Sequence, residues 1–235
     1  MTSVLKFKSE IRSARDEMRR SGISCLTPRI RQWLGTIGFP GGVVVGDVIK
    51  SWDVLKTATF LRDHLPRETP ILDVGTYASE ILSVLHRMKF SCLAGVDLNP
   101  RIKEMPFADH IRYEVADFMA TPFPDGSFGA ITAISVIEHG FESKRLLREI
   151  SRLLRPGGYF IASFDYWPEK VDTAGIDIFG MDWRIFSKSE VLAFIEEARA
   201  VGLSPCGEID LEGGDKVIRW GGKDYTFAWL ALGKN

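Results

Sequence analysis

Two apolar segments, each reaching a turn or a carboxylate where a strand should stop, constrain the fold more than any other feature. Residues 71–75 (ILDVG) are typical of a buried strand that runs into a tight turn. Residues 95–98 (GVDL) are typical of another buried strand, which ends on the carboxylate of Asp97. The spacing of about twenty residues between turn and carboxylate predicts a nucleotide-binding βαβ unit. In such a unit the turn holds the polar middle of a nucleoside-bearing cofactor, and Asp97 accepts hydrogen bonds from the ribose.

Strands and helices are expected to alternate along the rest of the chain. Apolar runs predict the strands, and helical periodicity with start and stop signals predicts the helices. The predicted strands are 71–74, 91–97, 111–115, 129–135 and 159–164, and the predicted helices are 51–65, 79–89, 142–154 and 190–200. Repeated βα units predict an α/β, doubly wound, Rossmann-like sheet that is mostly parallel, with helices on both faces. Two further strands, 204–210 and 225–232, have too short a connection for a crossover helix and should pair antiparallel.

The first 66 residues are expected to form a helical cap or arm ahead of a domain at 67–235. Residues 1–21 have the spacing of an amphipathic helix with a basic polar face, which is either simply solvated or part of a homodimer arm or a lid. Residues 38–46 are rich in glycine and should break any helix. The predicted helix start at 51 could offer Lys50 and free N–H groups to a cofactor carboxylate. The alternative is that Ser51 caps this helix and Trp52 belongs to the core.

Composition argues against several classes of protein. The formal net charge is -1 and the pI is about 6.4, so no overall basic field would attract nucleic acid or an anionic membrane. The three cysteines are far apart, which argues against a disulfide framework and for a reducing, cytoplasmic location. No pair of histidines or cysteines has metal-site spacing, and no apolar run approaches the length of a membrane span. The N-terminus lacks the apolar region of a signal peptide.

Four sequence blocks, in order and at characteristic spacing, resemble the class I S-adenosylmethionine-dependent methyltransferases. The resemblance covers about residues 50–232 and is strongest to the small-molecule, type 11-like branch, which includes ubiquinone and sterol methyltransferases. The blocks are ILDVG at 71–75, GVDL at 95–98, ADF at 116–118 with PFPDGSF at 122–128, and IEH at 137–139 with LLRPGG at 153–158. The resemblance implies S-adenosylmethionine as the cofactor, and the antiparallel last strand suits the family's seven-stranded sheet.

The resemblance also implies how the methionine end of the cofactor is bound. Asp73 would lie under the turn and meet the amino group, directly or through water. Gly75 would let the backbone pass close to the cofactor. The other residues expected around this end are Lys50, Trp52, Thr76, Tyr77, Ser135 and Val136.

The nucleoside end is expected at the next two strand ends. Asp97 would bind the ribose diol, Leu98 would line the adenine, and Asn99 would lie beside them. Asp117 would take the exocyclic amine of the adenine, and Phe118 would offer its backbone N–H to the ring. Each aspartate alone could be a solvated strand end, but together they are convergent polar groups at one sheet edge.

The turn itself departs from the family pattern. The family usually places two more glycines after Gly75, and Tyr77 and Ser79 stand at those positions. Glycine permits positive φ and close backbone approach, so both changes bear on cofactor binding. Tyr77 could lean over the cofactor as a lid, or it could obstruct it.

Methyl transfer needs an aligned nucleophile and, for a hydroxyl or amine acceptor, a base. His139 is the only histidine expected near the reactive edge, although it could instead be a structural residue at a helix start. Asp165, after the predicted strand 159–164, is the second candidate, and the two could share one substrate proton. His139 and Asp165 could form a metal site together with Glu138, but the three residues lack metal-ligand spacing, so no metal is expected.

The segment 165–186 mixes aromatic and charged residues and should overhang the ligand side as a substrate-side insertion. It supplies the acceptor-binding candidates Tyr166, Trp183 and Arg184, and Trp220 and Tyr225 should help to shape the same pocket. The sequence therefore predicts methyl transfer to a small molecule. The favoured acceptor is an oxygen of a sugar or glycoconjugate, and the alternative is a quinone, lipid or secondary metabolite. A nicotinamide-dependent oxidoreductase lacks its glycine fingerprint here. A non-catalytic scaffold is the remaining alternative.

Overall fold

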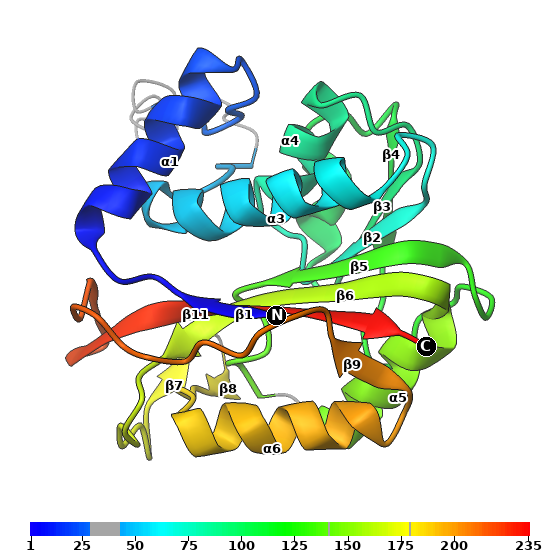
Figure 1. Cartoon of the computed structure of the whole chain (residues 1–235). Coiled ribbons are helices and arrows are strands. Elements are labelled where there is room, and N and C mark those ends of the chain that lie inside the picture. Colours follow the sequence, from blue (N-terminus) through cyan, green and yellow to red (C-terminus); the bar gives the residue numbers. More distant parts are fainter. Residues whose placement is uncertain (29–42, 141, 179) are drawn as a thin grey trace.

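A mixed sheet of nine strands runs through the protein, with helices on both faces (Figure 1). The structure is a computed structural model, and it describes residues 1–28, 43–140, 142–178 and 180–235. The main path through the sheet is β1-β11-β6-β5-β2-β3-β4, and β9 and β10 also pair with β11. The strands are β1 (Thr2–Val4), β2 (Ile71–Val74), β3 (Leu93–Asp97), β4 (Ile111–Val115), β5 (Phe128–Ile134), β6 (Leu154–Tyr166), β7 (Asp177–Ile178), β8 (Met181–Asp182), β9 (Leu203–Pro205), β10 (Ile218–Trp220) and β11 (Lys223–Lys234).

The helices divide between the two faces of the sheet. They are α1 (Lys8–Arg20), α3 (Ser51–His64), α4 (Ile81–Arg87), α5 (Ser143–Leu153) and α6 (Lys188–Arg199), with the short 3₁₀ turns η1 (Val48–Lys50) and η2 (Pro100–Glu104). In Figure 1, α3 and α4 lie on one face with α1 against α3, and α5 and α6 lie on the other. Each face has its own apolar core, as a doubly wound sheet requires.

The predicted fold class is confirmed. Strands β4, β3, β2, β5 and β6 are parallel neighbours, and β11 runs antiparallel to β6. The predicted antiparallel pairing of the last two strands is also confirmed, since Leu232 of β11 faces Pro205 of β9. Ser187 and Glu190 form the capping box that begins α6. The sheet has more strands than the predicted seven because β1 and β10 also join β11.

The N-terminus is the main correction to the predicted elements. Residues 1–21 are not one helix: Thr2–Val4 forms β1, which pairs with β11, and α1 begins only at Lys8. The buried residues of α1 are Ile11, Ala14, Arg15 and Met18, and the helix packs against α3 of its own chain. The homodimer arm and the domain boundary at residue 66 remain predictions. The glycine-rich stretch 38–46 lies mostly outside the described residues.

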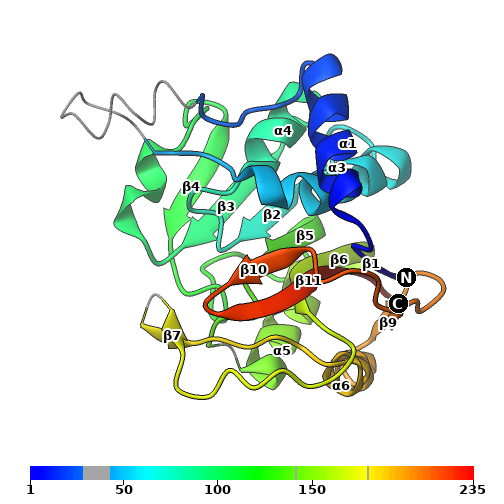
Figure 2. The same cartoon turned by 90° about the vertical axis from the view of Figure 1, so that its left-hand side faces the viewer.

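The segment between β6 and α6 leaves the sheet and returns to it. It contains the small hairpin β7–β8, and its end comes back to the sheet through a bridge between Tyr166 and Phe186. Figure 2 shows β7 and the β10–β11 hairpin on the same side of the protein. The expected substrate-side insertion therefore lies beside a second projecting element that the sequence did not predict. No helix in the described part of the chain is both long and apolar enough to cross a membrane.

Candidate functional site

The candidate site lies where the order of the parallel strands reverses. From β2 the chain continues to β3 and β4 on one side, and it then crosses to β5 and β6 on the other. In doubly wound sheets, ligands bind at the carboxyl ends of the strands beside this switch point. The turn after β2 and the end of β5 flank it, and most of the predicted site residues follow one of these strand ends.

The turn after β2 explains how the chain tolerates its missing glycines. Gly75 has a φ of +67°, a conformation that glycine adopts without strain. The second residue of the turn with positive φ is Ala78, at +63°; Tyr77 and Ser79 do not need this conformation. The departures from the family pattern therefore cause no backbone strain at positions 77 and 79. The strain falls on Ala78 instead.

Asp97 ties this turn to the end of β3. Its Oδ2 accepts a hydrogen bond from the backbone N–H of Tyr77 at 3.0 Å, and its Oδ1 accepts one from Asn99 at 2.8 Å. The carboxylate is partly exposed, and Leu98 beside it is 64% exposed. An exposed leucine beside an oriented carboxylate is the arrangement expected for a nucleoside site.

One polar atom on each of two side chains under the turn has no hydrogen-bond partner among the described residues. Asp73 accepts a hydrogen bond from the Thr132 hydroxyl at 2.6 Å, but its other oxygen, Oδ2, is buried without one. The hydroxyl of Thr76 is likewise buried without a partner. Burial raises the pKa of Asp73 to about 7, against the lowering effect of the hydrogen bond from Thr132. Because unpaired buried polar atoms are costly, this pair points to a ligand group.

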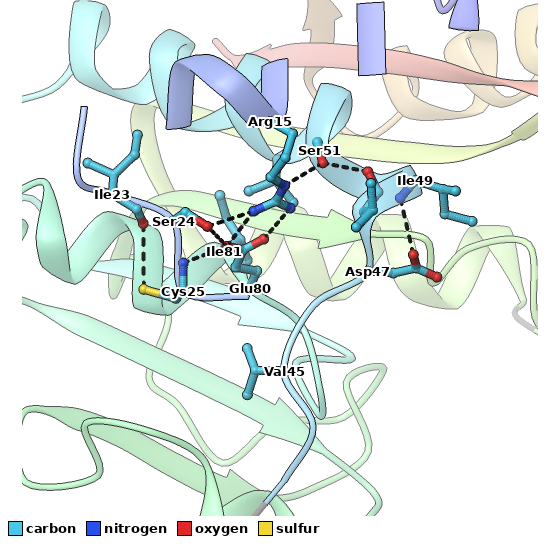
Figure 3. Close-up of polar contacts among 12 residues, drawn as sticks. Arg15, Ile23, Ser24, Cys25, Val45, Asp47, Ile49, Ser51, Glu80 and Ile81 are labelled. Atoms are coloured by element: carbon cyan, nitrogen blue, oxygen red, sulfur yellow. Dashed lines mark hydrogen bonds and ion pairs between the residues drawn. The ribbon is translucent and has the colours of Figure 1, made fainter. Parts of the chain in front are cut away.

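A buried ion pair fastens the N-terminal segment to the end of the same turn (Figure 3). The guanidinium of Arg15 donates to both oxygens of Glu80, at 3.0 and 2.8 Å, and to the hydroxyl of Ser51 at 2.8 Å. The backbone N–H of Cys25 also donates to Glu80, at 2.6 Å. Helix α1 therefore holds both the turn after β2 and the start of α3, which no sequence pattern indicated.

Lys50 reaches from η1 to the ends of β5 and β6. Its ammonium donates to the hydroxyl of Ser135, lies 4.0 Å from Asp165 and sits 3.5 Å from the centre of the Phe227 ring. The predicted Lys50 is therefore in the site. Trp52 is not: it is 8% exposed and belongs to the core on the α3 face, which was the alternative reading of that residue.

Two buried carboxyls lie beside Lys50. Glu138 is 2% exposed, and its Oε2 has no partner among the described residues. Burial, with Asp165 as a second cause, raises the pKa of Glu138 to about 8. Burial also raises the pKa of Asp165, whose Oδ2 accepts a hydrogen bond from the indole of Trp183 at 2.8 Å.

His139 follows Glu138 in sequence, but its pKa is shifted downward, whereas those of Glu138 and Asp165 are shifted upward. Burial, with the charge of Lys50 as a second cause, lowers its pKa to about 4. The imidazole is therefore neutral at pH 7 and a weak proton acceptor. Its backbone pairs with Trp183 in an isolated bridge, which fixes the segment after β5 against the insertion.

A cavity of about 580 Å³ lies between this segment and the insertion. The residues around it include Glu138, Lys170, Asp182, Trp183 and Arg184. Two of the three predicted acceptor residues are thus at one cavity, and Trp183 also meets Trp220 of the β10–β11 hairpin edge to face.

Tyr166 is a correction. It is fully buried, and its hydroxyl donates to the backbone carbonyl of Leu211 at 2.6 Å. Neighbouring residues of a strand face opposite sides of the sheet. Asp165 faces the candidate site, so Tyr166 packs into the core on the other side.

The remaining predicted residues lie near the strand ends but already have partners. Asp117 accepts from the backbone of Met119 and pairs with Arg145 at 2.9 Å, and Phe118 packs against the core. Val136 is buried against Gly75: a Cβ added to Gly75 would lie only 2.5 Å from a methyl group of Val136. The adenine roles of Asp117 and Phe118 stay predictions.

Asp53 was missed by sequence reasoning. It is fully buried in α3, accepts from the Ser163 hydroxyl at 2.9 Å, and has its pKa raised to about 6 by burial. An acidic residue directly after Trp52 in an apolar stretch was the available signal. Among the described residues, no three His, Cys, Asp or Glu side chains are grouped so as to hold a metal ion.

Comparison with known proteins finds similarity to methyltransferases. Residues 72–162, from β2 into β6, match the family model described as "Methyltransferase domain". The 2-methyl-6-phytyl-1,4-hydroquinone methyltransferase of Synechocystis sp. is 25% identical over 157 residues, which cover 60% of this chain and 48% of that protein. The chain spans less than half the length of the curated relatives it matches first.

Solved structures agree on the fold. Geranyl diphosphate C-methyltransferase from Streptomyces coelicolor A3(2) has a TM-score of 0.58 and 18% identity, with 94% of this chain and 98% of that chain covered. The [4+2]-cyclase SpnF has the same TM-score at 19% identity, covering 80% and 83%. The chain therefore has the fold of the class I S-adenosylmethionine-dependent methyltransferases, and residues 72–162 match the methyltransferase family model. Because a cyclase is also similar, the site must decide the reaction.

Proposed function

We propose that this protein transfers a methyl group from S-adenosylmethionine to a small-molecule acceptor. The observation that carries the proposal is the position of Asp97 within the methyltransferase domain, at the end of β3 with its carboxylate bonded to the turn after β2. Both carboxylate oxygens keep lone pairs free for ribose hydroxyls. Leu98, exposed next to it, would contact the adenine.

The polar atoms under the turn after β2 could bind the amino-acid end of S-adenosylmethionine. Asp73 Oδ2 is buried and without a partner in the described chain, and an ammonium group is the kind of group that would satisfy it. The hydroxyl of Thr76, similarly placed, could accept or donate. Lys50 lies at the other side of the switch point, beside Ser135, where it could meet a carboxylate. Asp73, Thr76 and Lys50 therefore fit the charged amino-acid end of S-adenosylmethionine.

The chain's own residues would then manage the acceptor and its proton. When bound, the cofactor supplies a methyl group activated by a sulfonium. A hydroxyl or amine acceptor must lose a proton, and Asp165 suits this task better than His139 because its pKa is raised rather than lowered. Trp183 holds the Asp165 carboxylate in place through its indole N–H. The buried surroundings exclude water.

The acceptor cavity supports a sugar or glycoconjugate. Lys170, Asp182 and Arg184 place charged groups around the cavity. Trp183 lines it but is 2% exposed, and Trp220, which packs edge to face on Trp183, is the more exposed aromatic ring at 45%. Aromatic faces beside polar groups suit the two kinds of surface on a sugar ring. The alternative is a quinone, lipid or secondary metabolite, which the name of the Synechocystis relative favours.

A screen of acceptors with isotopically labelled methyl donor tests the proposal. Label should pass to members of one acceptor class, and sugars, quinones and lipids should be separate arms. Binding of S-adenosylhomocysteine without transfer to any acceptor would favour the scaffold alternative. A thermal shift with NAD and none with S-adenosylhomocysteine would contradict the proposal itself.

Once an acceptor is known, two variants separate the candidate bases. Asp165→Asn should lower kcat by about 10²- to 10⁴-fold, the usual contribution of a general base, without lowering S-adenosylhomocysteine affinity. His139→Asn should lower kcat by less than about tenfold, since the neutral ring is a weak base. The reverse order would assign the proton to His139.

A further inference from the structure

The ends of β5 and β6 bury more negative groups than positive ones. Three carboxyls, those of Asp53, Glu138 and Asp165, are at most 4% exposed. The charge of Lys50 acts on all three, and Lys50 is the one cation among the causes of their altered pKa values. Ionised carboxyls are costly to bury without a partner, so a single ammonium cannot offset all three.

The three carboxyls differ in how well their oxygens are satisfied. Asp53 accepts from Ser163 and from the backbone of Val54. Asp165 accepts from the indole of Trp183 on one oxygen and has Lys50 near the other. Glu138 has Oε2 buried without a partner among the described residues. The proton that the cluster must hold therefore belongs to the Glu138–Asp165 pair, in which each charge disfavours the other.

Groups from every surrounding element act on this pair. Lys50 of η1 favours the ionised form, and Asp53 of α3 is the third acid near that ammonium. Tyr225 of β11 approaches Asp165, and burial, followed by the charges of the two carboxyls, raises its pKa, so it stays a neutral phenol. His139, next in sequence to Glu138, has its pKa lowered to about 4 and stays neutral near pH 7. No second cation among these groups offsets the pair.

The pair lies on the side of the switch point that the reactive part of the cofactor would reach. Asp97 marks the nucleoside end at β3, and β2 and the switch point separate it from β5. A cofactor lying across the switch point from Asp97 extends toward the end of β5, where Ser135 begins the segment that carries Glu138.

We propose that Glu138 and Asp165 act together as a counter-ion for the positively charged sulfonium of the donor. This inference rests on the proposed function. The buried pair holds one proton when no cationic ligand is present, and the donor's charge displaces that proton to the solvent. The neutral thioether of S-adenosylhomocysteine leaves the proton in place. The site thereby distinguishes donor from product by charge.

Calorimetric titration tests this without any acceptor. S-adenosylmethionine and S-adenosylhomocysteine are each titrated into the whole chain at pH 7 in phosphate and in Tris, whose ionisation enthalpies differ. The dependence of the binding enthalpy on the buffer gives the number of protons released. We expect the donor to release up to about one proton more than the product, the most that one carboxyl can contribute.

Two variants test whether the difference in proton release between the two ligands comes from Glu138 and Asp165. Glu138→Gln should abolish the difference between the two ligands while keeping S-adenosylhomocysteine binding, and Asp165→Asn should do the same if the first variant fails to fold. Asp73→Asn is the matched control, because both ligands carry the amino group and it should change both proton counts equally.

Equal proton release by the two ligands, or a difference that persists in both pair variants, would overturn the inference. If neither ligand binds the unaltered protein, the proposed function itself is wrong, and the inference falls with it. Binding of both ligands with equal proton release would instead contradict only the counter-ion.

Discussion

The backbone N–H of Tyr77 donates to Asp97 across 3.0 Å, so the turn after β2 and the end of β3 are one unit. The carboxylate also accepts from Asn99, which fixes its orientation. Tyr77, which stands where the family usually has glycine, therefore contributes its backbone N–H to the candidate site. The same carboxylate that would bind the ribose also organises the turn.

Asp97→Ala should abolish the thermal shift given by S-adenosylhomocysteine. The substitution removes both the proposed ribose acceptor and the group that holds the Tyr77 and Asn99 amides. For the unaltered protein, a ligand at a hundredfold excess over Kd contributes about 2.7 kcal/mol. Asp109→Ala, at an exposed position, is the control and should retain the full shift. A full shift in Asp97→Ala would remove this residue from the ribose role.

Ala78→Gly should stabilise the protein by up to about 1 kcal/mol, because Ala78 has a φ of +63° and glycine relieves that strain. Ser79→Gly restores a family glycine, but Ser79 does not have positive φ. It should therefore give no gain and cost about 0.5–1 kcal/mol in chain entropy. Urea unfolding measures both. The opposite ranking would mean that the strain lies at residue 79.

Arg15→Ala should destabilise the protein by about 3–5 kcal/mol, because it leaves the Glu80 carboxylate buried and uncompensated. The two side chains are 3% and 1% exposed. The exposed pair of Lys6 and Asp210 is the control, and Lys6→Ala should cost at most about 1 kcal/mol. If both variants lose the same small amount in urea unfolding, Arg15 does not clamp the turn.

Stability without ligand should fall as the pH rises from about 5.5 to 8.5. Burial raises the pKa values of Asp53, Asp73 and Glu138 to about 6, 7 and 8, above those of an unfolded chain. The folded state thus binds protons more tightly, and the stability present at low pH is lost as the pH passes through these raised values.

Thermal unfolding across this pH range checks the sign. Asp73→Asn should reduce the slope around pH 7, where that carboxyl ionises, whereas Asp109→Asn should leave the slope unchanged. A melting temperature that rises steadily from pH 5.5 to 8.5 would show that these carboxyls are ionised in the folded protein.

The parallel sheet and its strand ends were predictable because they rest on local patterns. Apolar runs marked the strands from β2 to β6, and spacing placed Asp73 and Asp97 at their ends. The capping box of Ser187 and Glu190 fixed the start of α6. Each of these signals is contained within a few residues, so a single sequence reveals it.

The rest depends on contacts between distant parts of the chain. Strand β1 has three residues and forms only because the edge of β11 is available to Thr2–Val4. Arg15 and Glu80 are 65 positions apart, and no local sequence pattern around either residue predicts their ion pair. Tyr166 was within reach of sequence reasoning, since strand alternation puts it opposite Asp165. Glu138 stood next to His139 in the recognised motif, but only its burial shows its importance.

A direct binding titration of S-adenosylhomocysteine, with NAD in parallel, tests whether Asp97 and the turn after β2 bind S-adenosylmethionine. We predict saturable, one-to-one binding of S-adenosylhomocysteine and no binding of NAD, because Asp97 and the turn after β2 suit the ribose while the dinucleotide fingerprint is absent. Saturable binding of NAD alone, or of neither ligand, would contradict it.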